Sequence, residues 1–215
     1  MKLEKTTKIL IVDDHPVVRK GLAQIISDED DLRVIAEVGL AKDAFKILDN
    51  KSIDFIILDL KLPDENGLEV LTKLNNFYSE IPVLILSAYP EEQYGIRSLK
   101  NGASGYMHKE TAAEELINAI REIINGGKYI SKNLSEILAN NITVNKTKKP
   151  HEILSLREFE VLMMIGLGKT VKQIAEKLSL STQTISTYRT RILNKMKLNN
   201  NAELIRYCFR ENLID

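Results

Sequence analysis

The fold is decided by the stretch FIILDLKLPDENGLEVL, residues 55–71. Its apolar run, Phe55 to Leu58, is continuous rather than alternating, which is typical of a parallel strand covered on both faces. Asp59 closes this run, and a loop containing Leu62-Pro63 and Asn66-Gly67 follows. A carboxylate at the end of a buried strand is therefore the first candidate for chemistry.

Further apolar runs of the same kind lie outside this stretch. They are Ile9 to Val12, Val34 to Ala36 and Val83 to Leu86. Between the runs, apolar residues recur at helical spacing, and the clearest stripes are Val18, Leu22, Ile25 and Ile26; Ala41, Ala44, Phe45 and Leu48; and Leu116, Ile120, Ile123 and Ile124. Strands and helices therefore alternate, which predicts an open parallel sheet with right-handed crossovers over about 120 residues.

The last helix of this α/β segment has signals at both ends. Thr111 and Glu114 have the spacing of a capping box, which would open the helix. Gly126-Gly127 would end it, because glycine suits the left-handed turn that follows a helix. The sheet domain is therefore predicted to occupy residues 1–127.

Beyond residue 127 the sequence indicates helices and no strand. Residues 128–151 are predicted to form a linker with one short helix, because their end is polar and has no apolar period. The helix-start signals that follow are the capping boxes Ser155 with Glu158 and Thr170 with Gln173, and the cap Ser181. A last helix is expected from about Ala202 to Asn212. Residues 152–215 are therefore predicted to be a small all-α domain of four helices.

Charge separates the two domains, although it cancels over the whole chain. The 215 residues contain 30 Lys plus Arg and 30 Asp plus Glu. Residues 1–125 hold 15 basic and 22 acidic side chains, a net charge of −7, whereas residues 126–215 hold 15 and 8, a net charge of +7. This asymmetry indicates that the two domains have different partners.

The composition also excludes several classes of protein. With 44% hydrophobic and 28% charged residues, the chain lies in the globular range. The single cysteine, Cys208, cannot form an internal disulfide, and no Cys or His cluster has zinc spacing. The charged start of the chain is unlike a signal peptide, and no apolar stretch approaches the roughly 18 residues of a membrane span. We therefore expect a cytoplasmic protein without a membrane partner.

Polar side chains end the predicted strands at one edge of the sheet, where ligands bind in open parallel sheets. These strand-end residues are Asp13-Asp14, Asp59, Ser87 and, after a fifth strand from Gly105, Lys109. Clustered carboxylates need a cation, and hard oxygen ligands suit Mg²⁺. A metal-neutralised carboxylate can attack a phosphoryl group, while a hydroxyl and an ammonium group can stabilise the added charge.

Each strand-end residue also has an ordinary structural explanation. These explanations are helix caps for Asp13 and Asp14, a turn for Ser87 and a solvated surface position for Lys109. The joint occurrence of such residues at four strand ends argues against chance. His15 and His108 are not included in the predicted site, because a histidine beside charged residues at a strand edge is ordinarily solvated.

The segments ILIVDDHP, IILDLKLPDENGLEVL, VLILSA and NGASGYMHK resemble, in this order, the receiver domain of bacterial two-component response regulators, over residues 8 to about 125. The resemblance implies a flavodoxin-like fold with a five-stranded parallel sheet in the order 2-1-3-4-5. It implies that Asp59 is the phosphoacceptor. The Mg²⁺ ligands that it implies are Asp13, Asp14, Asp59 and the backbone carbonyl of Lys61, and the residues that contact or respond to phosphate are Ser87, Tyr106 and Lys109.

Two positions of this resemblance carry open points. Tyr106 could also be an ordinary half-buried aromatic residue of a strand. Glu110 stands where many receivers have proline, which we expect to affect the loop after the fifth strand and not the chemistry.

In the second domain, the segment from Val171 to Leu193 predicts two helices joined by a tight turn near Ser179 and Leu180. The second helix has an apolar side, formed by Ile185, Tyr188, Ile192 and Met196, and an opposite polar side, formed by Gln183, Ser186, Thr187, Thr190 and Asn194. Arg191, Lys195 and Lys197 flank the polar side. Such a face suits the major groove of DNA, although for an isolated helix a merely solvated face is the commoner explanation.

The segment LSLREFEVLMMIGLGKTVKQIAEKLSLSTQTISTYRTRILNKMKL resembles the helix-turn-helix output domain of the NarL/FixJ (LuxR-type) class, which would span about residues 152–213. The resemblance implies that Ser181 to Lys197 is the recognition helix and that the last helix contributes to dimer formation. The predicted DNA contacts are Thr182, Gln183, Ser186, Thr187, Thr190, Arg191 and Lys195. Ser186 and Asn201 replace a lysine and an arginine of many members, so the base preference is left open.

The sequence thus predicts a response regulator in which a sensor histidine kinase phosphorylates Asp59 and so controls dimerisation and sequence-specific binding to double-stranded DNA. Salt-dependent binding to paired half-sites is expected. One alternative is a haloacid-dehalogenase-like phosphatase, which also uses a strand-end aspartate and Mg²⁺ but requires a second acid where this chain has Lys61. The other is a constitutive DNA-binding dimer whose receiver does not switch.

Overall fold

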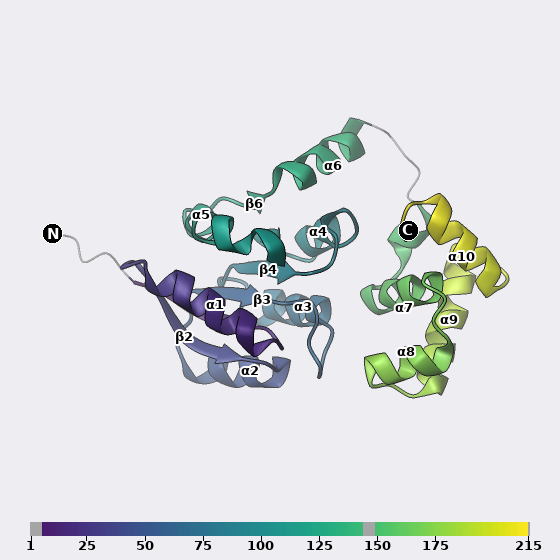
Figure 1. Ribbon diagram of the computed structural model, residues 1–215, viewed down its shortest axis with the longest axis horizontal. Helices are drawn as coiled ribbons and strands as arrows, with labels where there is room; N and C mark the ends of the chain where they lie inside the picture. Colours follow the sequence, from purple (N-terminus) through teal and green to yellow (C-terminus); the bar gives the residue numbers. More distant parts are fainter. Residues whose placement is uncertain (1–5, 144–148, 215) are drawn as a thin grey trace. The chain divides into compact units, whose positions relative to one another are not determined.

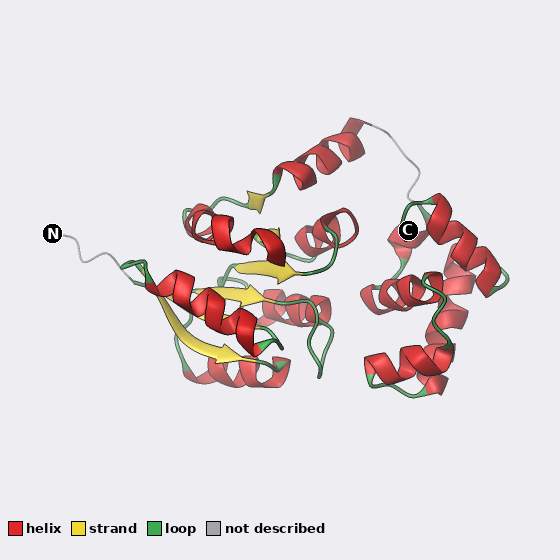
Figure 2. Cartoon of the chain, viewed as in Figure 1, coloured by secondary structure: helices red, strands yellow, loops and turns green. Residues whose placement is uncertain are grey.

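The computed structural model describes residues 6–143 and 149–214. The chain divides into two compact units, residues 1–143 and residues 144–215 (Figure 1). The first unit combines a sheet with helices, and the described part of the second contains helices only (Figure 2).

Strands and helices alternate in the first unit, as the sequence predicts. Its strands are β1 (Thr7–Val12), β2 (Leu32–Val38), β3 (Phe55–Leu58), β4 (Val83–Ser87), β5 (Gly105–His108) and β6 (Tyr129–Ile130). Its helices are α1 (Pro16–Ser27), α2 (Ala41–Asn50), α3 (Gly67–Phe77), α4 (Glu91–Lys100), α5 (Ala112–Ile124) and α6 (Lys132–Thr143), and a short 3₁₀ turn, η1 (Lys109–Thr111), precedes α5. All strands are parallel, in the order β2-β1-β3-β4-β5-β6. The predicted fold class and the order of the first five strands are confirmed.

The sixth strand corrects the prediction of a five-stranded sheet with no strand after Lys128. Tyr129 and Ile130 pair in parallel with Gly105 and Tyr106 of β5. A strand of two residues is too short to show any apolar period, so the sequence pattern could not indicate it.

The continuous apolar runs are explained by helices on both faces of the sheet. Helices α1 and α5 cover one face, and α2, α3 and α4 cover the other (Figure 1). In β3, the side chains of Phe55 to Leu58 are each at most 1% exposed. A strand buried on both faces has no solvent side that would favour polar residues.

Helix α6 packs against α4 within the first unit. Leu134 of α6 is fully buried, and a Cβ atom added to Gly95 of α4 would lie only 2.8 Å from its Cδ1. Ser131 Oγ donates a hydrogen bond of 2.6 Å to Glu91 Oε2. The short helix expected inside the linker therefore exists, and its first turns are held on the sheet unit. Residues 144–148 of the predicted linker lie outside the described residues.

The start of α5 differs from the predicted capping box. Thr111 has helical backbone angles (φ −92°, ψ −5°), and its side chain forms no cap for α5. Its Oγ1 instead donates to the carbonyl oxygen of His108 at 3.1 Å. Because η1 runs directly into α5, Thr111 is not in the extended conformation that a capping residue adopts, and this prediction is wrong. Gly126 ends α5 with φ +86°, as predicted.

The second unit consists of α7 (Leu156–Gly166), α8 (Val171–Leu178), α9 (Thr182–Met196) and α10 (Asn201–Arg210), after a 3₁₀ turn η2 (Pro150–Ile153). The two predicted capping boxes, at Ser155 and Thr170, are both present, and Ser181 caps α9. Ser179, with φ +52°, makes the tight turn between α8 and α9. The predicted four-helix layout is therefore confirmed.

In the part of the chain that the structure describes, no helix is both long enough and apolar enough to cross a membrane.

Candidate functional site

The carboxyl ends of the strands bring three of the predicted site residues together. Asp13 follows β1 and Asp59 follows β3, and each of these residues is only 2% exposed. Lys109 follows β5, and its Nζ lies 2.7 Å from Asp59 Oδ2 and 2.7 Å from Asp13 Oδ2. One ammonium group thus bridges two buried carboxylates that are far apart in the sequence.

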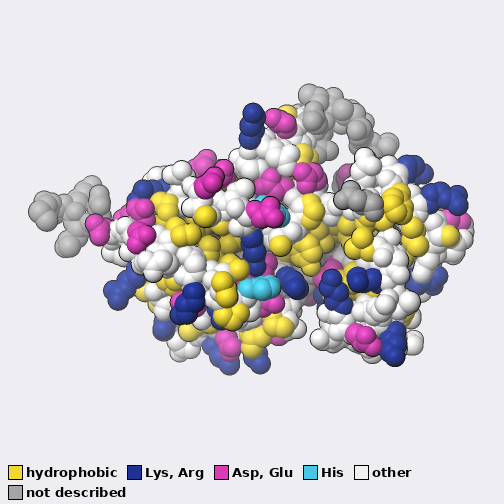
Figure 3. Space-filling view, in the orientation of Figure 1, with side chains coloured by type: hydrophobic (Ala, Val, Ile, Leu, Met, Phe, Trp, Pro, Cys, Tyr) yellow, Lys and Arg dark blue, Asp and Glu magenta, His cyan; other side chains and the backbone are white. Residues whose placement is uncertain are grey.

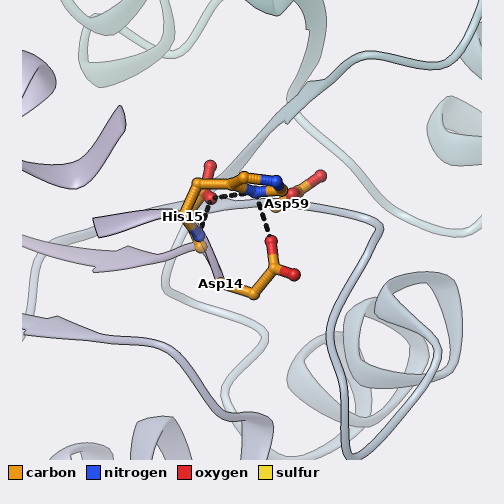
Figure 4. Close-up of side chains that lie close together, drawn as sticks. Asp14, His15 and Asp59 are labelled. Carbon is orange, nitrogen blue, oxygen red and sulfur yellow. Dashed lines mark hydrogen bonds and ion pairs between the residues drawn. The ribbon is translucent and has the colours of Figure 1, made fainter. Parts of the chain in front are cut away.

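His15, which the sequence prediction excluded, belongs to the same cluster. Its Nδ1 lies 3.3 Å from Asp13 Oδ1 and forms an ion-pair contact with Asp14. Figure 4 shows that Asp14, His15 and Asp59 lie close together. Ligand atoms of Asp13, Asp14, His15 and Asp59 all lie within 4.8 Å of one another. The sequence feature that could have placed His15 in the cluster is its position directly after two aspartates at a strand end.

The helix-cap explanation for the first two aspartates is not supported. The residue that precedes α1 is His15, and no side chain caps this helix. Asp13 Oδ1 accepts a hydrogen bond of 2.8 Å from the backbone N–H of His15, which fixes the carboxylate beside the strand end. Asp14 is therefore free of a capping role.

Burial and charge set the protonation of this pair. Burial raises the pKa of Asp59, and the hydrogen bond and charge of Lys109 only partly oppose that effect. For Lys109, burial would lower the pKa, but its close contacts with the carboxylates of Asp13 and Asp59 and their negative charges outweigh burial, and the pKa is raised. Lys109 is thus held as a cation beside a carboxylate that is costly to ionise.

The donor set fits a divalent cation. Asp13 Oδ2 and Asp14 Oδ1 are buried oxygens without a well-aligned hydrogen bond, and each is approached by a cationic or imidazole nitrogen. Carboxylate oxygens are the ligands that Mg²⁺ prefers in proteins. The backbone N–H of Lys61 donates to Asp59 Oδ1 at 3.1 Å, which places this residue beside the cluster. The role of its carbonyl group as a ligand stays a prediction.

The predicted hydroxyl and aromatic residues are linked through a residue that sequence reasoning missed. Ser87 and Tyr106 are both fully buried, so Tyr106 is not a half-buried strand residue. The Tyr106 hydroxyl donates to the carbonyl oxygen of Tyr89 at 2.6 Å, and the Tyr89 N–H donates to Ser87 Oγ at 3.2 Å. The Tyr89 ring stacks on Tyr94 of α4, with centroids 4.5 Å apart. A chain of contacts thus runs from the strand end to α4.

His108 and Glu110 form hydrogen bonds that hold the loop after β5. The His108 ring bonds to the carbonyl oxygen of Ala88 through Nε2, at 3.3 Å, and its Nδ1 accepts from the Glu110 N–H at 3.4 Å. Proline at position 110 would remove that N–H group. Glu110 thus supplies a loop hydrogen bond that proline could not make, and its effect on the chemistry stays a prediction.

Gly67 allows α3 to start directly against the phosphoacceptor candidate. A Cβ atom at this position would lie 2.4 Å from Leu60 Cα and 2.5 Å from the Asp59 carbonyl oxygen. Backbone atoms cannot move away as a flexible side chain can, so only glycine fits here.

In the second unit, α9 presents the predicted polar side to solvent. Ile185, Ile192 and Met196 are buried. The exposed side chains include Thr182, Gln183, Ser186, Thr187, Thr190, Arg191 and Lys195. Lys195 is also tied to the buried carboxylate of Glu158 in α7, because its Nζ donates to Oε2 at 2.6 Å. All seven predicted contact residues are therefore accessible, but one of them already has an acidic partner.

Side chains of both charges are present on the face of the protein that Figure 3 shows. Acidic and basic side chains lie side by side on the face of the first unit that Figure 3 shows, and Lys and Arg side chains are visible near both ends of the second unit.

Fold and site together define a class of protein. A parallel α/β unit with buried aspartates and a lysine at its strand ends is joined to a helical unit with an exposed polar helix after a tight turn, which is the arrangement of a phosphoacceptor domain with a helix-turn-helix domain. Residues 9–121 match the family model of the response regulator receiver domain, and residues 152–208 match that of bacterial regulatory proteins of the luxR family. The chain belongs to the response regulators with a receiver domain and a LuxR-type DNA-binding domain.

Known proteins resemble the chain over almost its whole length. It is 35% identical to the oxygen regulatory protein NreC of Staphylococcus carnosus over 215 residues, which cover 97% of this chain and 99% of NreC. It is 31% identical to the response regulator UvrY of Escherichia coli K12 over 206 residues, which cover 95% and 94%. The fold matches that of the Salmonella typhimurium RcsB response regulator with a TM-score of 0.70, at 22% identity, over 94% of this chain and 96% of that one.

Membership of the response regulator family decides between the predicted regulator and the phosphatase alternative. The family is a class of DNA-binding transcription regulators, so the predicted function class is confirmed and the alternative of a haloacid-dehalogenase-like phosphatase is excluded. The presence of Lys61 in place of a second acid agrees with this result.

Proposed function

We propose that a sensor histidine kinase transfers a phosphoryl group to Asp59 and that the modification controls dimerisation and binding to double-stranded DNA. The observation that carries this proposal is the position of Lys109 Nζ, 2.7 Å from both Asp59 and Asp13 at the strand ends. This site holds a nucleophile and a cation that can pair with the product. The cytoplasmic location expected from the sequence is part of the proposal.

The transfer exchanges a P–N bond of the kinase for a P–O bond at Asp59. A carboxylate oxygen of Asp59 attacks the phosphorus of a phosphohistidine, and a P–O bond forms while the P–N bond breaks. The bonding electron pair stays on the imidazole nitrogen of the kinase, which takes up a proton. Mg²⁺, held by Asp13, Asp14, Asp59 and the Lys61 carbonyl, would supply charge neutralisation for the attacking and transferred oxygens.

The remaining residues would then respond to the product. A phosphoryl group brings roughly −2 charges to a buried place, and Lys109 can donate to one of its oxygens. The Ser87 hydroxyl can donate to another. Because Ser87 also accepts from Tyr89, whose carbonyl holds Tyr106, this new bond would change the strand-end loop and its contact with α4.

For the second unit, we propose that α9 enters the major groove and that two chains occupy paired half-sites. One short helix reaches few base edges, and a second copy doubles the specific contacts. RcsB, which shares the fold, has been solved as two dimers bound to two parallel DNAs. The basic balance of residues 126–215 favours contact with phosphates.

The phosphoacceptor is tested by intact-mass measurement after incubation of the full chain with acetyl phosphate and Mg²⁺. We expect an adduct of about 80 Da that hydroxylamine removes, as for an acyl phosphate. Asp59→Glu should lack it, whereas Asp30→Asn, which changes an exposed aspartate, should keep it. An unmodified wild-type chain under every donor, or an unchanged adduct in Asp59→Glu, would refute the assignment.

The switch is tested by selection of bound DNA from a random pool, with and without acetyl phosphate. We expect enrichment of an inverted repeat that is at least tenfold stronger with the donor for the wild type and independent of the donor for Asp59→Ala. Equal enrichment by both chains under the donor would instead favour a constitutive dimer.

A further inference from the structure

Three hydroxyl groups on the exposed side of α9 share one hydrogen-bonding pattern. Ser186 Oγ donates to the Thr182 carbonyl at 2.9 Å, Thr187 Oγ1 to the Gln183 carbonyl at 3.0 Å, and Thr190 Oγ1 to the Ser186 carbonyl at 3.0 Å. Each donor thus bonds to the backbone four residues earlier in its own helix. Ser186, Thr187 and Thr190 are all exposed, and we call these three residues the hydroxyl stripe.

This pattern decides what the hydroxyl stripe offers to a ligand. A hydroxyl has one hydrogen and two lone pairs, so a hydroxyl whose hydrogen is used inside the helix can only accept from outside. To donate outward, it would have to give up a bond that it already makes. The two threonines, which are exposed residues, add methyl groups. The stripe therefore presents acceptors and methyl groups rather than donors.

The cations around the stripe do not reverse this character. Lys195 Nζ is bonded to Glu158, and Arg189 Nε donates to Asn201 Oδ1 at 2.5 Å. Arg191 is exposed but lies about 100° around the helix from Thr190, at the edge of the polar side. The lysine that many related domains carry at position 186 is absent, so the centre of the stripe has no cationic donor.

The edges of base pairs differ in how well they match such a surface. Guanine shows only acceptors in the major groove, N7 and O6, which would face the acceptors of the stripe. Adenine shows an amino donor at N6, and its partner thymine shows a methyl group. Cytosine offers an amino donor but no methyl group. An A·T pair therefore matches the stripe in both respects.

We propose that Ser186, Thr187 and Thr190 read A·T pairs at the centre of each half-site, by accepting from adenine N6 and by contact of the threonine methyl groups with thymine. This inference rests on the proposed binding of α9 in the major groove. It adds the base class that these residues select and the groups through which they select it.

The test uses the full chain with acetyl phosphate and the half-site obtained by selection. In that site, each thymine is replaced in turn by uracil, which removes the methyl group, and each adenine by purine, which removes the amino group. We expect each replacement at a central position to weaken wild-type binding about 5- to 10-fold, in the range of single base contacts.

Two variants of Thr190 separate the groups. Thr190→Ser keeps the hydroxyl and loses the methyl group, so its binding should no longer respond to uracil at the position that it reads. Thr190→Val keeps the methyl shape and loses the hydroxyl, so its binding should no longer respond to purine. Thr72 in α3 makes the same bond to the carbonyl four residues earlier, at 2.9 Å to Leu68, and Thr72→Ser is the matched control that should behave as the wild type.

The outcomes distinguish this inference from the proposed function. A selected half-site centred on G·C pairs, or binding that ignores both base analogues in all variants, overturns the inference and leaves DNA binding intact. A phosphorylated chain that selects no sequence at all overturns the proposed function and the inference with it.

Discussion

Lys109 is the residue on which the charge of the strand ends depends. It joins two carboxylates that are each 2% exposed, and its own side chain is 15% exposed. A buried ion pair adds little stability compared with apolar packing, but removing one partner leaves the other charge without compensation. Lys109 therefore compensates the charge of the two buried carboxylates in the unphosphorylated chain, in addition to its proposed contact with phosphate.

We predict that Lys109→Met lowers the free energy of unfolding by about 3 kcal/mol, because Asp13 and Asp59 lose their shared cation. Mg²⁺ should restore more stability to this variant than it adds to the wild type, since a bound cation replaces the missing charge. Urea denaturation with and without Mg²⁺ measures both effects. Lys20→Met, which removes an exposed cation 3.5 Å from Glu37, is the control and should change stability by less than about 0.5 kcal/mol. A loss equal to that of the control would contradict the prediction.

For single residues, the sequence could predict which side chains lie at the strand ends but not every residue that they contact. Asp13, Asp59 and Lys109 are found from the sequence because each follows a buried strand, and parallel strands end at a common edge. His15 and Tyr89 were missed because their contacts depend on the backbone path of short loops. Tyr89 contributes through its N–H and C=O groups, and no side-chain pattern reveals which backbone groups a loop will present.

At the scale of elements, the start of α7 is coupled to α9. Glu158 closes the capping box with Ser155, is 3% exposed, and accepts from Lys195. Burial alone would raise the pKa of Glu158, but the hydrogen bonds from Lys195 and from Ser155 outweigh burial and lower it. One carboxylate thus stabilises the start of α7 and also holds a lysine of α9.

We predict that Glu158→Gln destabilises the helical unit by about 1 kcal/mol at neutral pH, because the amide keeps the cap but loses the ion pair. Since the pKa of Glu158 is lowered in the folded chain, its contribution is complete above the ordinary glutamate range and is lost as the pH falls through the folded value. The stability difference between wild type and variant should therefore shrink below about pH 4. Thermal unfolding of both chains from pH 3 to 7 measures it, with the exposed Glu152→Gln as control. A difference that is constant with pH would show that the charge has no part.

Local signals predicted most elements, and the exceptions have local causes. Three capping residues of the helical unit were correct because an extended loop precedes each helix, which is the geometry that a cap requires. Thr111 has the same sequence pattern but is itself the last residue of the 3₁₀ turn η1, and β6 is set by pairing with β5 rather than by its own two residues. Tertiary context overrides the pattern in both cases.

At the scale of the whole chain, the two units have their own cores and opposite net charge. The sequence predicted this division from the change in charge and in apolar period. It placed the end of the sheet domain at residue 127, whereas the first compact unit reaches Thr143. The difference arises from β6 and α6, which complete the sheet edge and cover α4.

We predict that a fragment of residues 1–143 is monomeric and stable, and that a fragment of residues 1–127 is less stable by about 3 kcal/mol, the scale of losing one buried leucine such as Leu134. The shorter fragment should also self-associate, because β5 loses its neighbour and an unpaired strand edge invites pairing. Denaturation and sedimentation velocity compare the two. Equal stability and equal mass would show that β6 and α6 are dispensable.

The pairing of Tyr129 and Ile130 with β5 also determines where domains of different response regulators can be joined. A chimera that joins this receiver to the output domain of another protein should keep the residues of this chain through Thr143. If the junction lay before Tyr129, a foreign segment would have to form the sixth strand and pack against Gly95 of α4. The two domains of this chain can therefore be exchanged at a junction after α6. The end of the sheet unit sets this junction, and it lies beyond residue 121, where the match to the receiver family model ends.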